Sequence, residues 1–127
     1  MKYLLSISII LSFSFGQWPT SPDNPLWLGE GVQAQVRATS DGGAFAAWLS
    51  DGNYHVYLQR LNSDGEPQWS NGGMVVSDQP NATWIAVHHM NLAVDGNDNA
   101  IISTLDTRTG IWQVYGYKVA PNGSMAW

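Results

Sequence analysis

Oxygen-bearing side chains at alternate positions form the sharpest candidate site in this sequence. Asp95, Asn97 and Asn99 have the D-x-N-x-N spacing of a calcium loop, and Asp106 stands at the twelfth place of such a loop. Hard oxygen ligands at this spacing are those that Ca²⁺ takes in proteins. Alanine occupies the sixth place, where calcium loops carry glycine, so a hairpin turn that binds no metal is the alternative. The sequence therefore predicts either no cofactor or Ca²⁺.

Trp84, His88 and Trp112 are the candidates for ligand binding. The two tryptophans have no counterpart at matching positions elsewhere in the chain, and flat aromatic rings suit the apolar faces of sugars. Core packing is the alternative for both of them. His88 and His89 are adjacent on a predicted strand, whose successive side chains point to opposite faces, so one metal ion shared by both rings is not expected. No Ser, His and Asp form a recognisable triad, and no catalytic residue is predicted.

Composition excludes several classes of protein. The 127 residues include no cysteine, which excludes disulfide scaffolds and thiolate metal sites. Five basic residues stand against ten acidic ones, and the net charge is −5. Because the basic residues form no stripe, binding to nucleic acid or to an anionic membrane surface is not expected. A charged fraction of only 12% also argues against coiled coils and charged helical bundles.

The first sixteen residues have the pattern of a secretory signal peptide. A positive residue, Lys2, precedes an apolar run from Leu4 to Phe15, and Ser14 and Gly16 place small residues before a cleavage point after residue 16. The run is too short for a membrane-spanning helix, which needs about 20 apolar residues. We therefore expect a secreted, extracellular or cell-surface protein, or a periplasmic one, with no membrane span after cleavage.

The remainder of the chain repeats itself. Three features recur 58 residues later in the same order: Tyr57 as Tyr115, Asp64-Gly65 as Asn122-Gly123, and Trp69 as Trp127. A third, partial copy places Trp27 at the position of Trp69, and these recurring tryptophans are expected to pack inside or between repeats. The internal similarity divides the chain into a signal peptide (1–16), the tail of a first unit (17–32), a blade-like repeat (33–77), an insertion (78–87) and a second, truncated repeat (88–127).

Within each unit the apolar residues alternate with a period of two, and glycine-rich turns bound every run. Asp-Gly and Asn-Gly pairs supply the positive φ that tight hairpins require. We expect strands near 33–39, 43–48, 54–61, 73–77, 88–94, 99–104 and 112–119. Four antiparallel strands in a unit of about 50 residues are typical of a propeller blade. The predicted fold is all-β, with about two propeller-like blades, and a small β-sandwich is the alternative.

These units resemble a β-propeller-type repeat of secreted bacterial proteins, with the pattern DGxGGxxxAWxDxRxGxxxxYxQRLNxxGxxxW. The matching residues are Asp41, Gly42, Gly43, Ala47, Trp48, Asp51, Tyr57, Gln59, Arg60, Leu61, Asn62, Gly65, Trp69, Gly73 and Val75. The second copy departs further, with Thr104 in place of Trp48, but it keeps Asp106 and Arg108 of the D-x-R element. The resemblance implies a fold and an exported location, and it implies no particular chemistry.

Two functions are compatible with these features. The first is a non-catalytic module with a structural or interaction role, which binds a glycan or another surface protein. The second is a fragment of an extracellular glycoside hydrolase with a sialidase-like propeller, whose catalytic residues lie in other blades. Two blades cannot close a ring and leave sheet edges unpaired, so we expect the missing blades to come from a longer parent chain or from an oligomer.

Overall fold

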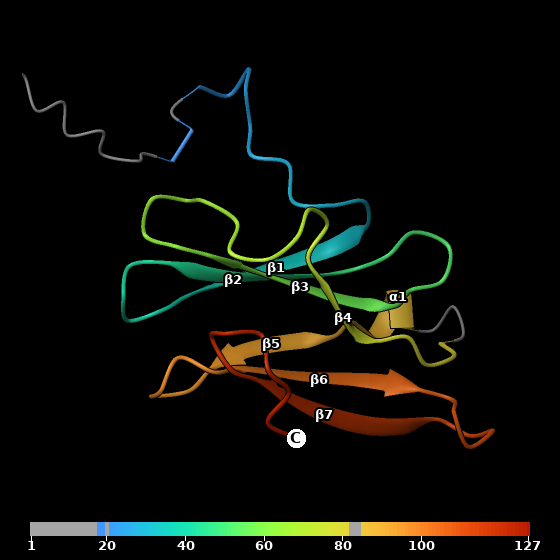
Figure 1. Cartoon of the computed structure of the whole chain (residues 1–127). Helices are drawn as coiled ribbons and strands as arrows, with labels where there is room; N and C mark the ends of the chain where they lie inside the picture. Colours follow the sequence, from blue (N-terminus) through green and yellow to red (C-terminus); the bar gives the residue numbers. More distant parts are fainter. Residues whose placement is uncertain (1–17, 20, 82–84) are drawn as a thin grey trace, which may run out of the picture.

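The protein is all-β, with two antiparallel sheets (Figure 1). The computed structural model describes residues 18–19, 21–81 and 85–127. The first sheet has the strand order β1 (Val32–Ala38), β2 (Ala44–Leu49), β3 (Val56–Leu61) and β4 (Met74–Ser77). The second has the order β5 (Asn91–Val94), β6 (Ala100–Asp106) and β7 (Gln113–Val119). The prediction of an all-β fold is confirmed, and each predicted strand corresponds to an observed one.

Hairpins at matching places in the two sheets are closed by the same backbone hydrogen bonds. Three of these bonds recur 58 residues later: Asn62 N to Glu66 O as Ala120 N to Ser124 O, Gly65 N to Asn62 O as Gly123 N to Ala120 O, and Gln68 N to Arg60 O as Ala126 N to Lys118 O. The turn glycines at 65 and 123 have φ of 80° and 86°, a left-handed conformation that glycine adopts without strain. The turn residues therefore set where each third strand ends.

One apolar core lies between the two sheets, which stack face to face (Figure 1). Alternate residues of β2, among them Phe45 and Leu49, meet Ile102 of β6 in this core, and all three are fully buried. Burial also alternates along β6, as expected for a strand with one face toward the core and the other outward. At one edge, the Gln35 side chain of β1 accepts a hydrogen bond from the amide of Leu92 (3.1 Å) and donates one to the carbonyl of Met90.

The outer face of the first sheet is covered by the segment that precedes β1. The ring nitrogen of Trp48 in β2 donates to the carbonyl of Glu30 (3.1 Å), and that of Trp18 donates to the carbonyl of Ser63 (3.1 Å). As a result every residue of β2 is buried, although only one face of this strand meets the second sheet.

The strand predicted to begin at His88 begins at Asn91 instead. Residues Ile85–His88 form a single helical turn, α1, which is closed by a hydrogen bond from the amide of His89 to the carbonyl of Ile85 (2.8 Å). His89 then takes a positive φ of 61°, which redirects the chain into β5. The turn is anchored because Ile85 and Met90 are both fully buried, so tertiary packing overrides the β-rich local sequence.

The predicted signal peptide and Trp84 lie outside the described residues. Among the residues that are described, no helix has the length and apolar character required to cross a membrane.

Candidate functional site

The main candidate site is a pocket on the outer side of the first sheet, which we call the aromatic pocket. Its volume is about 300 Å³, and it is lined by Trp27, Glu30, Trp48, Ser50, Asp51, Tyr57 and Gly72. Trp48 of β2 and Tyr57 of β3 are direct cross-strand partners, and their rings stack with centroids 5.9 Å apart and an interplanar angle of 17°. Strand register therefore places two of the three aromatic rings.

Glycines allow the chain to close tightly around Trp48. A Cβ at Gly29 would lie 2.5 Å from the Cζ2 atom of this ring. A Cβ at Gly73, whose φ is +72°, would lie 2.6 Å from the carbonyl oxygen of Leu58 and 2.9 Å from the Trp48 ring. Trp48 is only 5% exposed, whereas Trp27 is 63% exposed. Trp48 thus forms a fixed wall of the pocket, and Trp27 offers an open ring face to a ligand.

The aromatic pocket is acidic. Glu30 and Asp51 both line it, and no basic side chain of the described residues does. Three of the basic residues lie elsewhere and are already paired with aspartates: Arg60 with Asp41, Arg108 with Asp106, and Lys118 with Asp95. The pocket can accept hydrogen bonds from hydroxyl or ammonium groups through its carboxylates and can stack apolar ligand faces on its rings.

An aspartate paired with a basic residue braces the hairpin in each sheet. Asp41 accepts from the Gly43 amide (3.1 Å) and lies 2.5 Å from an Nη of Arg60. Asp95 accepts from the Asn99 amide (2.9 Å) and lies 2.8 Å from Nζ of Lys118. The hydroxyl of Thr39 and the backbone amide of Gly43 lower the pKa of the Asp41 carboxyl. Lys118, and then Asn99, hold the pKa of Asp95 well below its usual range.

The four residues of the predicted calcium loop are not brought together. Asp95, Asn97 and Asn99 share one turn, in which Asp95 accepts hydrogen bonds from the amides of the other two residues. Asp106 lies at the far end of β6, about 20 Å away at the usual rise per residue, and is bound by Arg108. No group of three or more acidic or histidine side chains suited to a metal gathers in the described residues.

Calcium binding at this turn therefore stays a prediction, and the structure suggests how to test it. An ion at Asp95 would have to replace the ammonium of Lys118, which lies 2.8 Å from the carboxylate. Because Ca²⁺ would have to displace this ammonium, we expect added Ca²⁺ at about 1 mM to leave the melting temperature unchanged, whereas an ion that binds the folded state would raise it. A rise that disappears in Asp95→Asn would establish the calcium site instead.

Acid is expected to weaken the second sheet through Asp95. Because the folded-state pKa of this carboxyl lies below its ordinary value of 3.8, its contribution to stability is complete above about pH 5. That contribution is lost as the pH falls from there through the lower, folded pKa. Asp95→Asn should flatten the fall in the urea midpoint between about pH 5 and pH 2, and Lys118→Met should flatten it too. An unchanged acid response in both variants would contradict the assignment.

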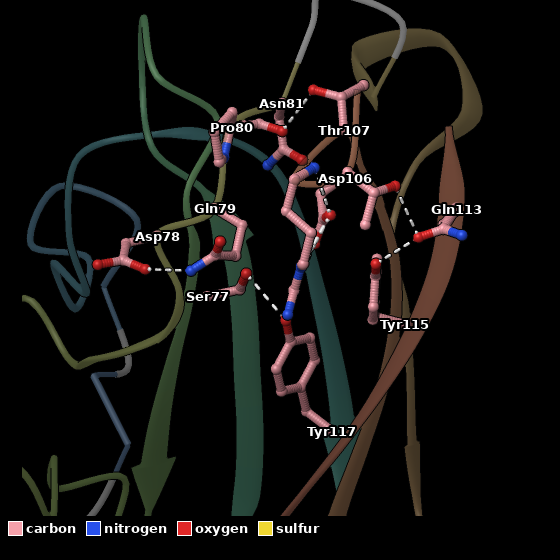
Figure 2. A network of polar contacts seen from close by, with 12 residues as sticks. Ser77, Asp78, Gln79, Pro80, Asn81, Asp106, Thr107, Gln113, Tyr115 and Tyr117 are labelled. Atoms are coloured by element: carbon pink, nitrogen blue, oxygen red, sulfur yellow. Dashed lines mark hydrogen bonds and ion pairs between the residues drawn. The ribbon is translucent and has the colours of Figure 1, made fainter. Parts of the chain in front are cut away.

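A second polar network joins the sheets at the opposite end of β6 (Figure 2). The buried carboxylate of Asp106 accepts from Nε (3.0 Å) and an Nη (2.5 Å) of Arg108, and this contact raises the arginine's pKa above its usual range. The same guanidinium donates to the hydroxyl of Tyr117 (2.5 Å), which donates to Ser77 Oγ in β4 (3.1 Å). It also lies 3.7 Å from the centroid of the Tyr115 ring. These contacts occupy the guanidinium, so the cluster is built to hold β4 against β7.

A double-mutant cycle should detect this link between the sheets. Tyr117→Phe and Ser77→Ala each remove one side of the hydrogen bond, and we expect a coupling of about 1 kcal/mol in the free energy of unfolding. Tyr115→Phe combined with Ser77→Ala serves as the control, because the Tyr115 hydroxyl bonds to Gln113 within its own strand. Equal coupling in both cycles would show that the effect does not come from this contact.

Of the three predicted binding residues, only Trp112 has a described side chain, and it does not line the aromatic pocket. Trp112 precedes β7 at the end of the β6–β7 hairpin, where it is 39% exposed beside the exposed Ile111. His88 ends α1, and its side chain is outside the described set, as is all of Trp84. His89 lines a second, smaller pocket of about 200 Å³ on the second sheet, together with Asn91 and Ser103. A shared binding site of Trp84, His88 and Trp112 therefore stays a prediction.

The sequence did not predict the aromatic pocket as a site, because the residues that line it are far apart in the sequence. Trp27 was expected to pack, yet it is largely exposed. One signal was available, since the pattern Trp-Leu-x-acid occurs twice, at Trp27–Glu30 and at Trp48–Asp51. Both pairs meet at this pocket.

Comparison with known proteins finds no matching family model, no matching curated protein and no matching solved structure.

Proposed function

We propose that this chain is a non-catalytic interaction module of an exported protein, and that it binds a glycan in the aromatic pocket. The observation that carries the proposal is the composition of this pocket. Three aromatic residues and two acidic residues line one space of about 300 Å³. Aromatic rings stack on the apolar faces of sugars, and carboxylates accept hydrogen bonds from their hydroxyl groups.

The lining residues also differ in exposure in a way that suits binding. Trp48 and Tyr57 are held by the β2–β3 register and by stacking on each other. Glu30 and Asp51 are exposed, and so is the ring of Trp27. A preformed wall with an accessible ring opposite it reduces the ordering entropy that binding must overcome.

A glycan array tests this proposal directly. The purified chain should bind a restricted set of glycans, and Trp27→Ala should weaken binding to them by about tenfold or more. Trp112→Ala is the matched control, because it removes another exposed tryptophan that does not line the aromatic pocket. Loss of binding in Trp112→Ala but not in Trp27→Ala would move the site to the β6–β7 hairpin.

A glycoside hydrolase is the second candidate, because Glu30 and Asp51 line the same pocket. Glycosidases use a pair of carboxylates as acid and base, or as acid and nucleophile. The bound glycan should be incubated with the chain and assayed for new reducing ends. Binding without product supports the module. Turnover that is abolished by both Glu30→Gln and Asp51→Asn would overturn the non-catalytic proposal.

We further propose that the two sheets are successive blades of a propeller-type array rather than a closed β-sandwich. The first strands of the two sheets, β1 and β5, lie side by side through Gln35, as blades around a common axis would. The half-buried Trp69 lies against the Asn122–Ser124 turn of the second sheet, with its Nε1 3.2 Å from the position of a Cβ on Gly123. Trp127, at the matching place, is 61% exposed, as expected if another blade packs there.

Light scattering on the purified chain distinguishes these arrangements. If the outer face of the second sheet accepts a further blade from another copy, the chain should form oligomers. Val114→Lys should then return them to monomers, because Val114 lies on that face and is 73% exposed. A monodisperse wild-type monomer with an unchanged melting temperature in Val114→Lys would favour the closed sandwich.

A further inference from the structure

The charge of the aromatic pocket is not balanced within the described part of the chain. Glu30 and Asp51 line the pocket without a basic neighbour, and no ion pair of a described residue involves either carboxylate. Two like charges that share a partly enclosed space repel each other unless a cation joins them. A ligand with a positive charge would remove this repulsion, whereas an anionic ligand would increase it.

Three aspartates among the described residues are each paired with a basic side chain. Asp41, Asp95 and Asp106 each lie within 2.8 Å of a guanidinium or ammonium nitrogen. The two sheets even repeat the arrangement, with Arg60 and Lys118 at matching strand positions. Among the described residues the pocket acids, like several surface acids, have no such ion pair, and what distinguishes them is that both line one pocket together with aromatic residues.

The aromatic rings favour the same kind of ligand. The face of a tryptophan or tyrosine ring carries negative charge density and attracts a cation placed over it. Trp27 offers such a face, because its side chain is 63% exposed at the mouth of a pocket that also contains both carboxylates. The rings and the carboxylates therefore both attract an ammonium group. The rings alone would stack on any sugar with an apolar face.

We infer that the glycan bound in the aromatic pocket carries free amino groups. A protonated amine of a 2-amino sugar enters the pocket, where Glu30 and Asp51 balance its charge while the sugar ring stacks on Trp27. This inference rests on the proposed glycan-binding function and adds the class of sugar. It predicts discrimination against the N-acetylated form of the same sugar, which has lost the charge and keeps the ring.

The experiment compares two oligosaccharides by calorimetry: a β-1,4-linked glucosamine hexamer and the same hexamer fully N-acetylated. At about pH 5.5 the free amines are charged, and the amino hexamer should bind about tenfold more tightly. At about pH 9 the amines are neutral, and the preference should disappear. Glu30→Gln combined with Asp51→Asn should abolish the preference at the lower pH, and Trp27→Ala should weaken both hexamers.

A control variant separates contact from overall charge. Asp23→Asn combined with Asp78→Asn removes the same number of charges from exposed positions that do not line the pocket, and it should keep the preference. Equal affinity of the two hexamers for the wild-type chain would overturn the amino-sugar inference and leave glycan binding in place. A preference lost equally in both double variants would also overturn it. Failure of both hexamers and of every glycan on the array would overturn the proposed function as well.

Discussion

Phe45→Ala is expected to lower the free energy of unfolding by about 3–5 kcal/mol. Phe45 is fully buried in the core between the sheets, where its ring lies 6.0 Å from that of Trp69. Alanine would remove these contacts and leave a cavity that the paired strands on either side cannot close. A domain of this size has a total stability of about 5–15 kcal/mol, so the variant should lose a large fraction of its stability.

Urea denaturation followed by tryptophan fluorescence measures this loss. Val36→Ala is the matched control, because Val36 lies on β1 of the same sheet but is 53% exposed, and it should change the stability by less than about 0.5 kcal/mol. Similar midpoints for Phe45→Ala and the wild type would mean that the two sheets do not share the core described here.

Arg60→Met is expected to cost about 2–3 kcal/mol. The Arg60 side chain is only 6% exposed and donates to the carbonyl of Leu61 (2.6 Å) and the hydroxyl of Thr39 (3.0 Å) as well as to Asp41. Its guanidinium also lies 5.0 Å from the centroid of the Phe45 ring. Methionine keeps the apolar stem but leaves the buried acceptors without donors, and the loss comes from those acceptors.

Two further variants identify the cause. Arg60→Lys should recover about half of the loss, because Lys118 at the matching place in the second sheet forms a 2.8 Å pair with Asp95. Arg37→Met should be nearly neutral, since Arg37 is exposed and, among the described residues, donates to the carbonyl of its neighbour Val36 alone. Thermal unfolding of the four proteins in one buffer gives the comparison. Equal losses of stability for Arg60→Lys and Arg60→Met would show that the several donors of the planar guanidinium are required and that a positive charge alone does not stabilise the site.

Both positions lie on the hairpin that carries the aromatic pocket. Strands β2 and β3 supply Trp48 and Tyr57, and the turn between the strands supplies Asp51. Destabilising variants at 45 or 60 should therefore reduce ligand binding only to the extent that they unfold the chain. Trp27→Ala should instead reduce binding without lowering the urea midpoint by more than about 0.5 kcal/mol, because its ring is exposed.

Much of the fold was predictable because its determinants are local. Alternation with a period of two and Asp-Gly or Asn-Gly turns specify antiparallel hairpins, and all seven strands form at or near the expected residues. The start of β5 was wrong by three residues. His88 and His89 carry no local signal for a helical turn, and the burial of Ile85 and Met90 in the apolar core produces it.

The candidate site was much less predictable, for a different reason. The spacing of Asp95, Asn97 and Asn99 correctly indicated an Asx-rich turn, but only the strand length shows that Asp106 lies at the other end of β6. Equally, nothing local brings Glu30 to Asp51. Their proximity depends on the segment before β1 folding back over the outer face of the first sheet.

The sequence by itself determined the all-β class, the antiparallel hairpins and their turns, because backbone conformation and side-chain alternation are short-range properties. Tertiary structure alone decided which aspartates are paired with cations and which face an open pocket, because that depends on residues tens of positions apart meeting across a sheet. Arg60 pairs with Asp41 and Lys118 pairs with Asp95, while Glu30 and Asp51 line one pocket and pair with no cation among the described residues.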